Sequence, residues 1–165
     1  MGITFNADEV FEMAEQIERN AEKFYRQASG HAAGKNIKKT LLSLADMEHK
    51  HIETFQEMRK ELSGREKGST VFDPDNEATM YLQSMADMRS YEGRISPTQQ
   101  LTGNESTEQI LNIAINSEKE SVVFYSGIRN SVSAKAGKDK VEKIIAEELN
   151  HLRVLLDERQ KLMRI

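Results

Sequence analysis

The chain contains an internal repeat in which identical residues recur 100 positions apart, and this repeat limits the folds that the chain can adopt. Two glutamates and one histidine of the first half have counterparts of the same identity and spacing in the second half. These six residues are Glu18, Glu48, His51, Glu118, Glu148 and His151. A Phe-Tyr pair is repeated in the same register, at residues 24–25 and 124–125. The chain therefore contains two copies of one pattern, and we expect the copies to fold alike.

Helix signals divide the first copy into two segments. Asn6 followed by Glu9 is a capping-box pattern, which predicts a first helix that extends to about residue 30. Gly34 separates this segment from a second helix, which we expect to end near Leu62. The two helices would form a hairpin over about residues 6–62.

The second copy shows the same organisation. Ser106 or Thr107 is the expected start of a third helix that runs to about Val132. After a short turn, a fourth helix is expected over about residues 138–164. These two helices would form a second hairpin over about residues 105–164.

Each predicted helix has an apolar stripe, at steps of three and four residues, with an ionisable residue at its centre. The stripes are Phe11, Ala14, Glu18, Ala21, Tyr25 and Ala28; Leu41, Leu44, Glu48, His51, Phe55, Met58 and Leu62; Leu111, Ala114, Glu118, Ser121, Tyr125 and Ile128; and Val141, Ile144, Glu148, His151, Leu155, Glu158 and Leu162. A charge on a buried stripe is costly unless it is paired. The central residues therefore need a common partner.

The segment between the hairpins, about residues 63–104, has a different character. It contains both prolines of the chain, Pro74 and Pro97, and a short helix is expected over about residues 77–88. A connection of about forty residues is far longer than the usual 4–6, and it suits a crossover between opposite ends of a bundle. We therefore expect one all-α domain over residues 1–165, a four-helix bundle of two duplicated hairpins joined by a long crossover.

The composition excludes several other classes of protein. A net charge of −4 without a basic stripe argues against nucleic-acid binding. The chain has no apolar run of about 20 residues and no secretion leader, so no membrane association and a cytoplasmic location are expected. The absence of cysteine excludes disulfides, zinc-thiolate sites, iron–sulfur clusters and thiol nucleophiles. Electron transfer would require a metal bound by oxygen and nitrogen, or a borrowed cofactor.

The repeated residues suit a site for two metal ions. Within each Glu-x-x-His pair the two side chains lie on one helix face and can reach a single interior point. Two divalent cations would balance four carboxylates, and two neutral imidazoles would complete the ligand set. Oxygen and imidazole ligands suit iron or manganese, and zinc could also bind. We therefore expect the six repeated residues to bind two iron ions, with manganese or zinc as alternatives.

The alternative interpretation is that these residues are unrelated surface residues, because a lone Glu-x-x-His pair carries little information. The chain has only four histidines, however, and two of them share the stripe position and the preceding glutamate. This repetition favours a metal site. The other two histidines, His31 and His49, fall outside the stripes and are expected to be solvated.

Tyr25 and Tyr125 each lie seven residues after a predicted ligand, Glu18 or Glu118, and therefore on the same helix face about two turns away. They could hydrogen-bond the ligand carboxylates or act as a redox outlet. They could also be ordinary core tyrosines with satisfied hydroxyl groups.

Together, the two copies resemble the ferritin-like di-iron carboxylate proteins, and in particular the rubrerythrin group. The resemblance is carried by Glu18, Ala21, Phe24, Tyr25, Glu48 and His51 in the first hairpin and by Glu118, Phe124, Tyr125, Glu148 and His151 in the second. It implies a ferritin-like four-helix bundle, a carboxylate-bridged di-iron centre and a reaction with peroxide or oxygen. It covers both hairpins but not the crossover.

Two differences from rubrerythrins bear on function. Rubrerythrins carry a cysteine-ligated, rubredoxin-type iron domain that delivers electrons, whereas this chain has no cysteine and would need an external electron donor. They also have an extra carboxylate three residues after the ligand of the third helix, where this chain has Ser121. The remaining set of four glutamates and two histidines is closer to that of bacterioferritins.

Three functions are compatible with these residues. The leading hypothesis is an oxidoreductase in which the six ligands act through the metals on peroxide or oxygen. The second is iron oxidation and storage of the ferritin type, although the chain ends 14 residues after His151, which leaves no room for the extra short helix of ferritin subunits. The third is a non-catalytic bundle stabilised by metal. Storage would require a hollow shell of many subunits, and otherwise a homodimer is expected.

Overall fold

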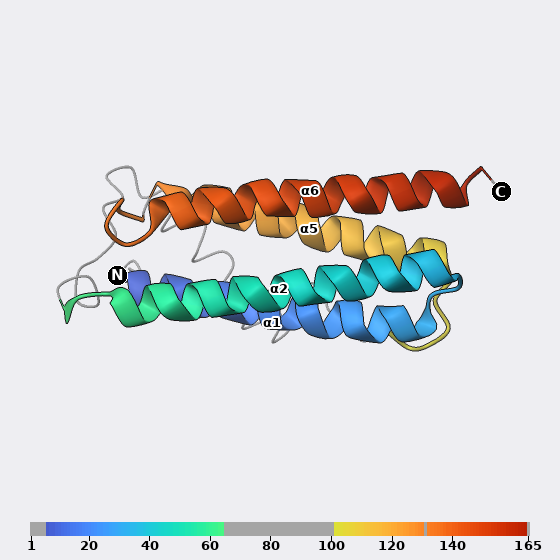
Figure 1. Ribbon diagram of the computed structural model, residues 1–165, viewed down its shortest axis with the longest axis horizontal. Coiled ribbons are helices and arrows are strands. Elements are labelled where there is room, and N and C mark those ends of the chain that lie inside the picture. Colours follow the sequence, from blue (N-terminus) through green and yellow to red (C-terminus); the bar gives the residue numbers. More distant parts are fainter. Residues whose placement is uncertain (1–5, 65–100, 131, 165) are drawn as a thin grey trace, which may run out of the picture.

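The structure, a computed structural model, describes residues 6–64, 101–130 and 132–164. In these segments the chain forms four helices, α1 (Ala7–His31), α2 (Lys35–Glu61), α5 (Thr107–Arg129) and α6 (Lys138–Leu162). Two hairpins, α1 with α2 and α5 with α6, lie side by side (Figure 1). The predicted all-α bundle of two hairpins is confirmed. No described helix combines the length and the apolar character that a membrane span requires.

Reciprocal capping pairs begin the first helix of each hairpin. The Asn6 side chain accepts a hydrogen bond from the Glu9 N–H at 2.9 Å, and the Glu9 carboxylate accepts one from the Asn6 N–H at 2.9 Å. Ser106 and Gln109 form the same pair at the start of α5. These side chains satisfy backbone N–H groups that have no partner within the helix.

A glycine precedes the second helix of each hairpin. Gly34 before α2 has a φ of +95°, and Gly137 before α6 has a φ of +99°. Glycine adopts this region readily because it has no Cβ, so it permits the tight reversal between antiparallel helices.

The helix α5 ends at Arg129, earlier than the predicted end at about Val132. Asn130 caps the helix, and the Ser133 hydroxyl accepts a hydrogen bond from the Ala136 N–H at 3.0 Å in the following turn. Asn and Ser side chains bond to nearby backbone groups in competition with helix continuation. The other predicted limits of the four bundle helices agree with the structure to within two residues.

The connection between the hairpins must span the length of the bundle. The end of α2 lies beside the α5–α6 turn, whereas α5 begins at the opposite end, beside the α1–α2 turn (Figure 1). There the Ala33 N–H donates a hydrogen bond to Thr107 Oγ1 at 2.9 Å. These positions support the predicted crossover from α2 to α5. The short helix expected over about residues 77–88 lies outside the described residues.

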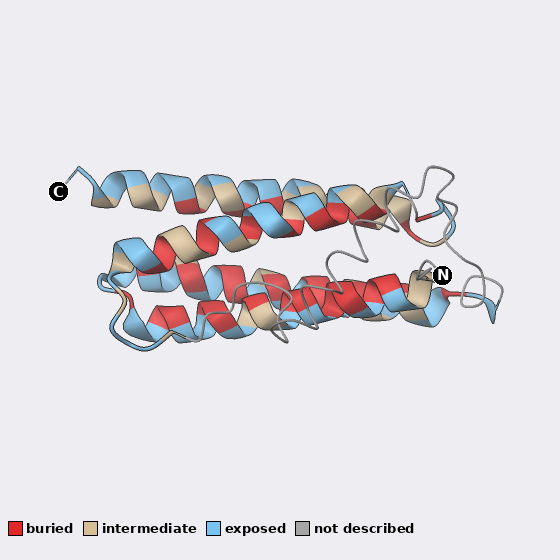
Figure 2. Cartoon of the chain, turned by 180° about the vertical axis from the view of Figure 1, so that it is seen from behind, coloured by how far each residue is buried: buried red, intermediate tan, exposed pale blue. Residues whose placement is uncertain are grey.

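Apolar side chains form two clusters, and each cluster contains residues of both hairpins. Phe11 of α1 and Phe124 of α5 belong to the first cluster. Leu41 of α2 and Leu155 of α6 belong to the second. The buried faces of the helices are turned toward the inside of the bundle (Figure 2). Burial of these faces, rather than helix propensity alone, therefore stabilises the bundle.

The four predicted stripes are buried except at the end of α6. Glu158 and Leu162 are only partly buried, and Met163 beyond them is 70% exposed. The stripe of α6 was thus predicted to be longer than it is, because the last turn of this helix has less of the bundle to pack against.

Candidate metal centre

The six repeated residues meet at one place inside the bundle, and each is at most 2% exposed. They comprise Glu18 of α1, Glu48 and His51 of α2, Glu118 of α5, and Glu148 and His151 of α6. Along every helix these residues separate the two apolar clusters. The centre is therefore enclosed by apolar side chains on both sides along the bundle.

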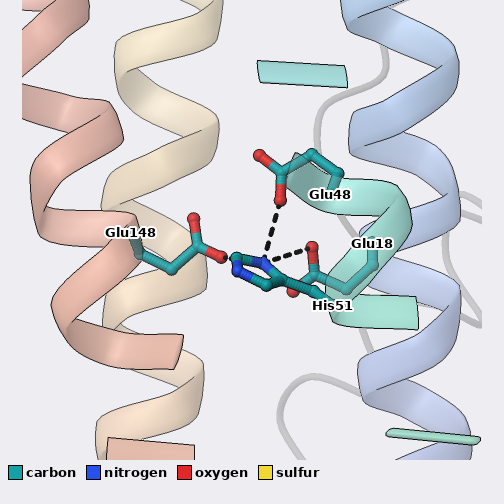
Figure 3. Close-up of side chains that lie close together, drawn as sticks. All are labelled: Glu18, Glu48, His51 and Glu148. Atoms are coloured by element: carbon teal, nitrogen blue, oxygen red, sulfur yellow. Dashed lines mark ion pairs between the residues drawn. The ribbon is translucent and has the colours of Figure 1, made fainter. Parts of the chain in front are cut away.

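The six residues form two groups that have two carboxylates in common. The groups are Glu18, Glu48, His51 and Glu148, and Glu48, Glu118, Glu148 and His151. Within each group, the potential ligand atoms lie within 4.8 Å of one another. Figure 3 shows the first group, in which carboxylates from three helices surround the imidazole of His51. This arrangement offers two neighbouring positions for a cation.

Glu48 and Glu148 are the shared residues, and each presents one oxygen to each histidine. Glu48 Oε2 lies 3.2 Å from His51 Nδ1, and its Oε1 lies 3.2 Å from His151 Nδ1. Glu148 Oε1 lies 3.0 Å from His51 Nδ1, and its Oε2 lies 3.3 Å from His151 Nδ1. The two imidazole rings are stacked, with centroids 5.7 Å apart. The two carboxylates are therefore placed to bridge.

Glu18 and Glu118 each face only one of the two histidines, as terminal ligands would, and each accepts a hydrogen bond from a tyrosine of the opposite hairpin. The Tyr125 hydroxyl donates a hydrogen bond to Glu18 Oε1, and the Tyr25 hydroxyl donates one to Glu118 Oε1. The second oxygen of each carboxylate faces the histidine Nδ1 of its own group, at 3.5 Å for Glu18 and 3.7 Å for Glu118. One oxygen of each terminal carboxylate is thus left for a cation.

The centre fits a pair of cations because it contains buried polar atoms that lack a hydrogen-bond partner within the described residues. They include both histidine Nδ1 atoms, both oxygens of Glu48, Oε2 of Glu118 and Oε1 of Glu148. An unsatisfied buried polar group costs about 1–3 kcal/mol, and more when it is charged. Side chains with these atoms would not be stable together unless protons or cations balanced them.

The distances within the centre also match cation coordination. Ligands that bind one cation at about 2.0–2.2 Å lie about 3.0–3.5 Å from one another. The oxygens of Glu48 and Glu148 lie 3.0–3.3 Å from the histidine Nδ1 atoms, yet these pairs are not aligned for hydrogen bonds. Close approach without hydrogen-bond alignment is expected of atoms that point at a shared ion.

Burial controls the protonation of the carboxyl groups. It raises the pKa of Glu118 to about 8, and the negative charge of Glu148 is the next cause. It also raises the pKa of Glu18, together with the charges of Glu148 and Glu48. Burial also acts to raise the pKa of Glu48 and of Glu148. Nearby side chains, the histidines among them, outweigh this effect, so the pKa of each of these two carboxyl groups is lowered.

The histidines show the complementary behaviour. Burial opposes their protonation, but the surrounding carboxylates raise the pKa of His151 to about 12 and also raise the pKa of His51. Without a metal, two neutral carboxyls, two carboxylates and two imidazolium groups therefore balance one another. Two divalent cations would balance four carboxylates and leave both imidazoles neutral. Protons and metal ions are thus alternative counter-charges for one centre.

One contact of the centre is absent from the repeat and was not predicted. The His51 Nε2–H donates a hydrogen bond to Glu147 Oε2 on α6, at 2.8 Å. Glu147 precedes His151 by four residues, but its counterpart in the first copy is Met47, so comparison of the copies does not reveal it. The available signal was the spacing of four residues between Glu147 and His151, which places both side chains on the same face of one helix.

The other residues considered from the sequence make no contribution of charge to the centre. His31 and His49 are exposed, as expected, and His49 Nδ1 lies 3.2 Å from Glu22 Oε2. Ser121 is buried and replaces a potential carboxylate ligand with a hydroxyl group. The structure therefore describes a centre of four carboxylates and two imidazoles.

Comparison with known proteins agrees with this geometry. A family model described as rubrerythrin matches residues 9–159, a range that includes all six residues of the centre. The chain belongs to the rubrerythrin family. This rubrerythrin-family chain is also similar to a crystal structure from Thermotoga maritima, of a protein provisionally described as a ferritin-like diiron-carboxylate protein. The two chains are 27% identical with a TM-score of 0.71, and the match covers 95% of this chain and 96% of that chain. No curated protein matches this one.

These matches confirm the predicted family and the ferritin-like fold. The family implies a di-metal site, typically of iron, and the described residues include two groups that could hold the ions.

Proposed function

We propose that this rubrerythrin-family protein binds two iron ions and reacts with peroxide or oxygen, after which an external donor re-reduces the metals. The proposal is carried by one observation, the two buried ligand groups that share Glu48 and Glu148. Glu18 with His51 would complete one position, and Glu118 would complete the other with His151. Manganese or zinc could occupy the same ligands.

When bound, two ferrous ions supply the two electrons that, with two protons, reduce one hydrogen peroxide to two water molecules. The side chains of the protein hold the centre in place for this chemistry. The bridging carboxylates would keep the two cations adjacent, and the tyrosine hydroxyls orient the terminal carboxylates. The apolar clusters limit access of bulk water, which strengthens the electrostatic interactions within the centre.

The proposal can be tested by anaerobic addition of peroxide to protein that carries two Fe(II) per chain. Growth of the near-UV absorbance of Fe(III), followed by stopped flow, should be faster than with the same concentration of free Fe(II). One peroxide should be consumed for every two Fe(II). The Glu48→Gln variant should lose this reaction, whereas Glu53→Gln, which changes a 62% exposed carboxylate on the same helix, should retain it. The proposal is rejected if protein-bound iron reacts no faster than free iron.

Iron oxidation for storage is the second candidate, because Ser121 leaves the centre with a bacterioferritin-like set of four glutamates and two histidines. Addition of excess Fe(II) and oxygen distinguishes the candidates. Storage requires continued uptake of many ions per chain by a large hollow assembly. An oxidoreductase without its external electron donor should instead oxidise only about two iron ions per chain. Light scattering measures the assembly and also tests the expected homodimer. Stabilisation by metal without any oxidation would instead indicate a structural role.

A further inference from the structure

The two halves of the centre differ in one contact, even though their ligand residues are identical. His51 uses its Nε2–H to bond Glu147, whereas Nε2 of His151 is buried and has no hydrogen-bond partner in the part of the chain that the structure describes. Met47 stands at the position of the first copy that corresponds to Glu147. A thioether is only a weak acceptor and cannot replace a carboxylate. The contact of Glu147 with His51 therefore breaks the approximate symmetry of the centre.

Glu147 is well placed to act on His51 without being a ligand of the centre. Its side chain is 35% exposed, and Glu147 Oε1 lies 3.8 Å from Lys143 Nζ, at the edge of the bundle. It belongs to neither of the two ligand groups. Its contact with the His51 ring lies on the side opposite Nδ1, the atom that faces the carboxylates Glu18, Glu48 and Glu148.

A hydrogen bond from one imidazole nitrogen to a carboxylate has a defined effect on the other nitrogen. It selects the tautomer with the proton on the bonded nitrogen, so the lone pair resides on the nitrogen that faces the metal. It also restrains the ring and increases its basicity as a ligand. Loss of such a partner typically lowers metal affinity about 10–100-fold. His151 has no corresponding restraint among the described residues.

We propose that Glu147 is a positioning residue that makes the two metal positions unequal, so that the cation beside Glu18 and His51 is held more tightly than the cation beside Glu118 and His151. The inference rests on the proposed binding of two metals by this centre. It goes beyond the proposed reaction, because it predicts the order in which the positions fill.

Cobalt(II) is a suitable probe because its visible absorption reports binding directly and no turnover is required. Wild-type protein that has been freed of metal with a chelator should bind two Co(II) ions in two resolved steps. Glu18→Gln should remove or weaken mainly the tighter step, and Glu118→Gln mainly the weaker one. This pair of variants assigns each step to one half of the centre.

The decisive variant is Glu147→Met, which makes the second copy match the first at this position. It should weaken the tighter step about 10–100-fold and bring the two steps together. Glu147→Gln should have a smaller effect, because its amide oxygen can still accept the Nε2–H bond. Glu142→Gln, at an exposed position on the same helix, is the matched control and should change neither step.

Proton NMR of the cobalt-loaded protein supplies a readout that general destabilisation would not mimic. A slowly exchanging, hyperfine-shifted imidazole N–H of His51 should be present in the wild type and lost in Glu147→Met. Equal affinities in the wild type, or unchanged steps in Glu147→Met, would overturn the inference while leaving the iron reaction intact. Unequal cobalt steps in a protein that shows no iron oxidation would support the inference and reject the proposed function.

Discussion

The hydroxyl of Tyr25 on α1 donates a hydrogen bond to Glu118 on α5, so a side chain of one hairpin orients a predicted metal ligand of the other. The repeat generates the reciprocal bond from Tyr125 to Glu18. Burial, followed by the neighbouring carboxylates, raises the pKa of both tyrosines well above the ordinary value. Both hydroxyls therefore stay protonated and remain donors, and the two hairpins are joined through the centre itself.

Replacing Tyr25 with phenylalanine should destabilise the metal-free protein by about 1–3 kcal/mol, because a buried carboxyl oxygen loses its donor. For a domain of this size, each kcal/mol lowers Tm by about 2–4 °C. Urea unfolding of the chelated protein measures the change. A double-mutant cycle with Glu118→Leu, which removes the acceptor, is the control, and the tyrosine change should cost less in that background. Additive effects would show that the two side chains do not interact.

The bridging and terminal carboxylates should differ in their effect on metal content. Glu148→Ala removes an oxygen from both positions and should reduce bound iron from about two ions per chain to well below one. Glu18→Ala removes a ligand from one position only and should leave about one ion per chain. Elemental analysis after reconstitution measures the ratio. Equal losses in the two variants would contradict the assignment of bridging and terminal roles.

The stability of the metal-free protein should fall as the pH rises from about 5 to 9. Glu118 titrates near 8 in the folded chain against an ordinary value of 4.5, so the folded state binds more protons than the unfolded state between these values. The raised pKa of His151, about 12 against 6.5, acts in the same direction from neutral pH upward. Stability decreases with pH wherever the folded state binds more protons. Thermal unfolding of the chelated protein at several pH values tests this trend.

The stabilisation that bound metal gives to the protein should, by contrast, increase as the pH rises. Because metal ligands must be deprotonated, affinity rises with pH, and the difference in Tm between loaded and chelated protein should widen. Loading near pH 6 should also release about four protons per two ions, from two carboxyls and two imidazolium groups. Calorimetry in buffers of different ionisation enthalpy counts these protons. A constant Tm difference and no proton release would contradict the conclusion that protons and metal ions are alternative counter-charges of the centre.

Three glycines should respond differently to replacement by alanine. At Gly137, a Cβ would lie 2.9 Å from Met58 Cε and the φ of +99° would be strained, so a loss of about 1–3 kcal/mol is expected. Gly34 has a similar φ of +95°, but its added Cβ would have no neighbour within 4 Å. Its variant should therefore lose only the stability that corresponds to backbone strain. Gly30 lies within α1 in open space, and its variant should be neutral or up to about 1 kcal/mol more stable. Urea unfolding of the three variants should therefore rank Gly137→Ala as the least stable.

The four described helices and the six residues of the candidate centre could be predicted from local sequence signals and from the repeat. Caps such as Asn6 with Glu9 act within a few residues, and helical periodicity places Glu48 and His51 on one face whatever surrounds them. The 100-residue repeat then indicated that the two halves contribute matching ligands. These features depend on local interactions or on identity between copies, and both can be obtained from a sequence.

The arrangement of these residues around one another could not be predicted in the same way, because it depends on the packing of the two hairpins. That Glu48 lies beside both histidines while Glu18 faces only His51 depends on how the hairpins face each other, and periodicity along one helix contains no such information. The same holds for the bond from Tyr25 to the opposite hairpin and for the contact of Glu147 with His51. These contacts join residues more than 90 positions apart, and their distances depend on the packing of whole helices rather than on any local segment.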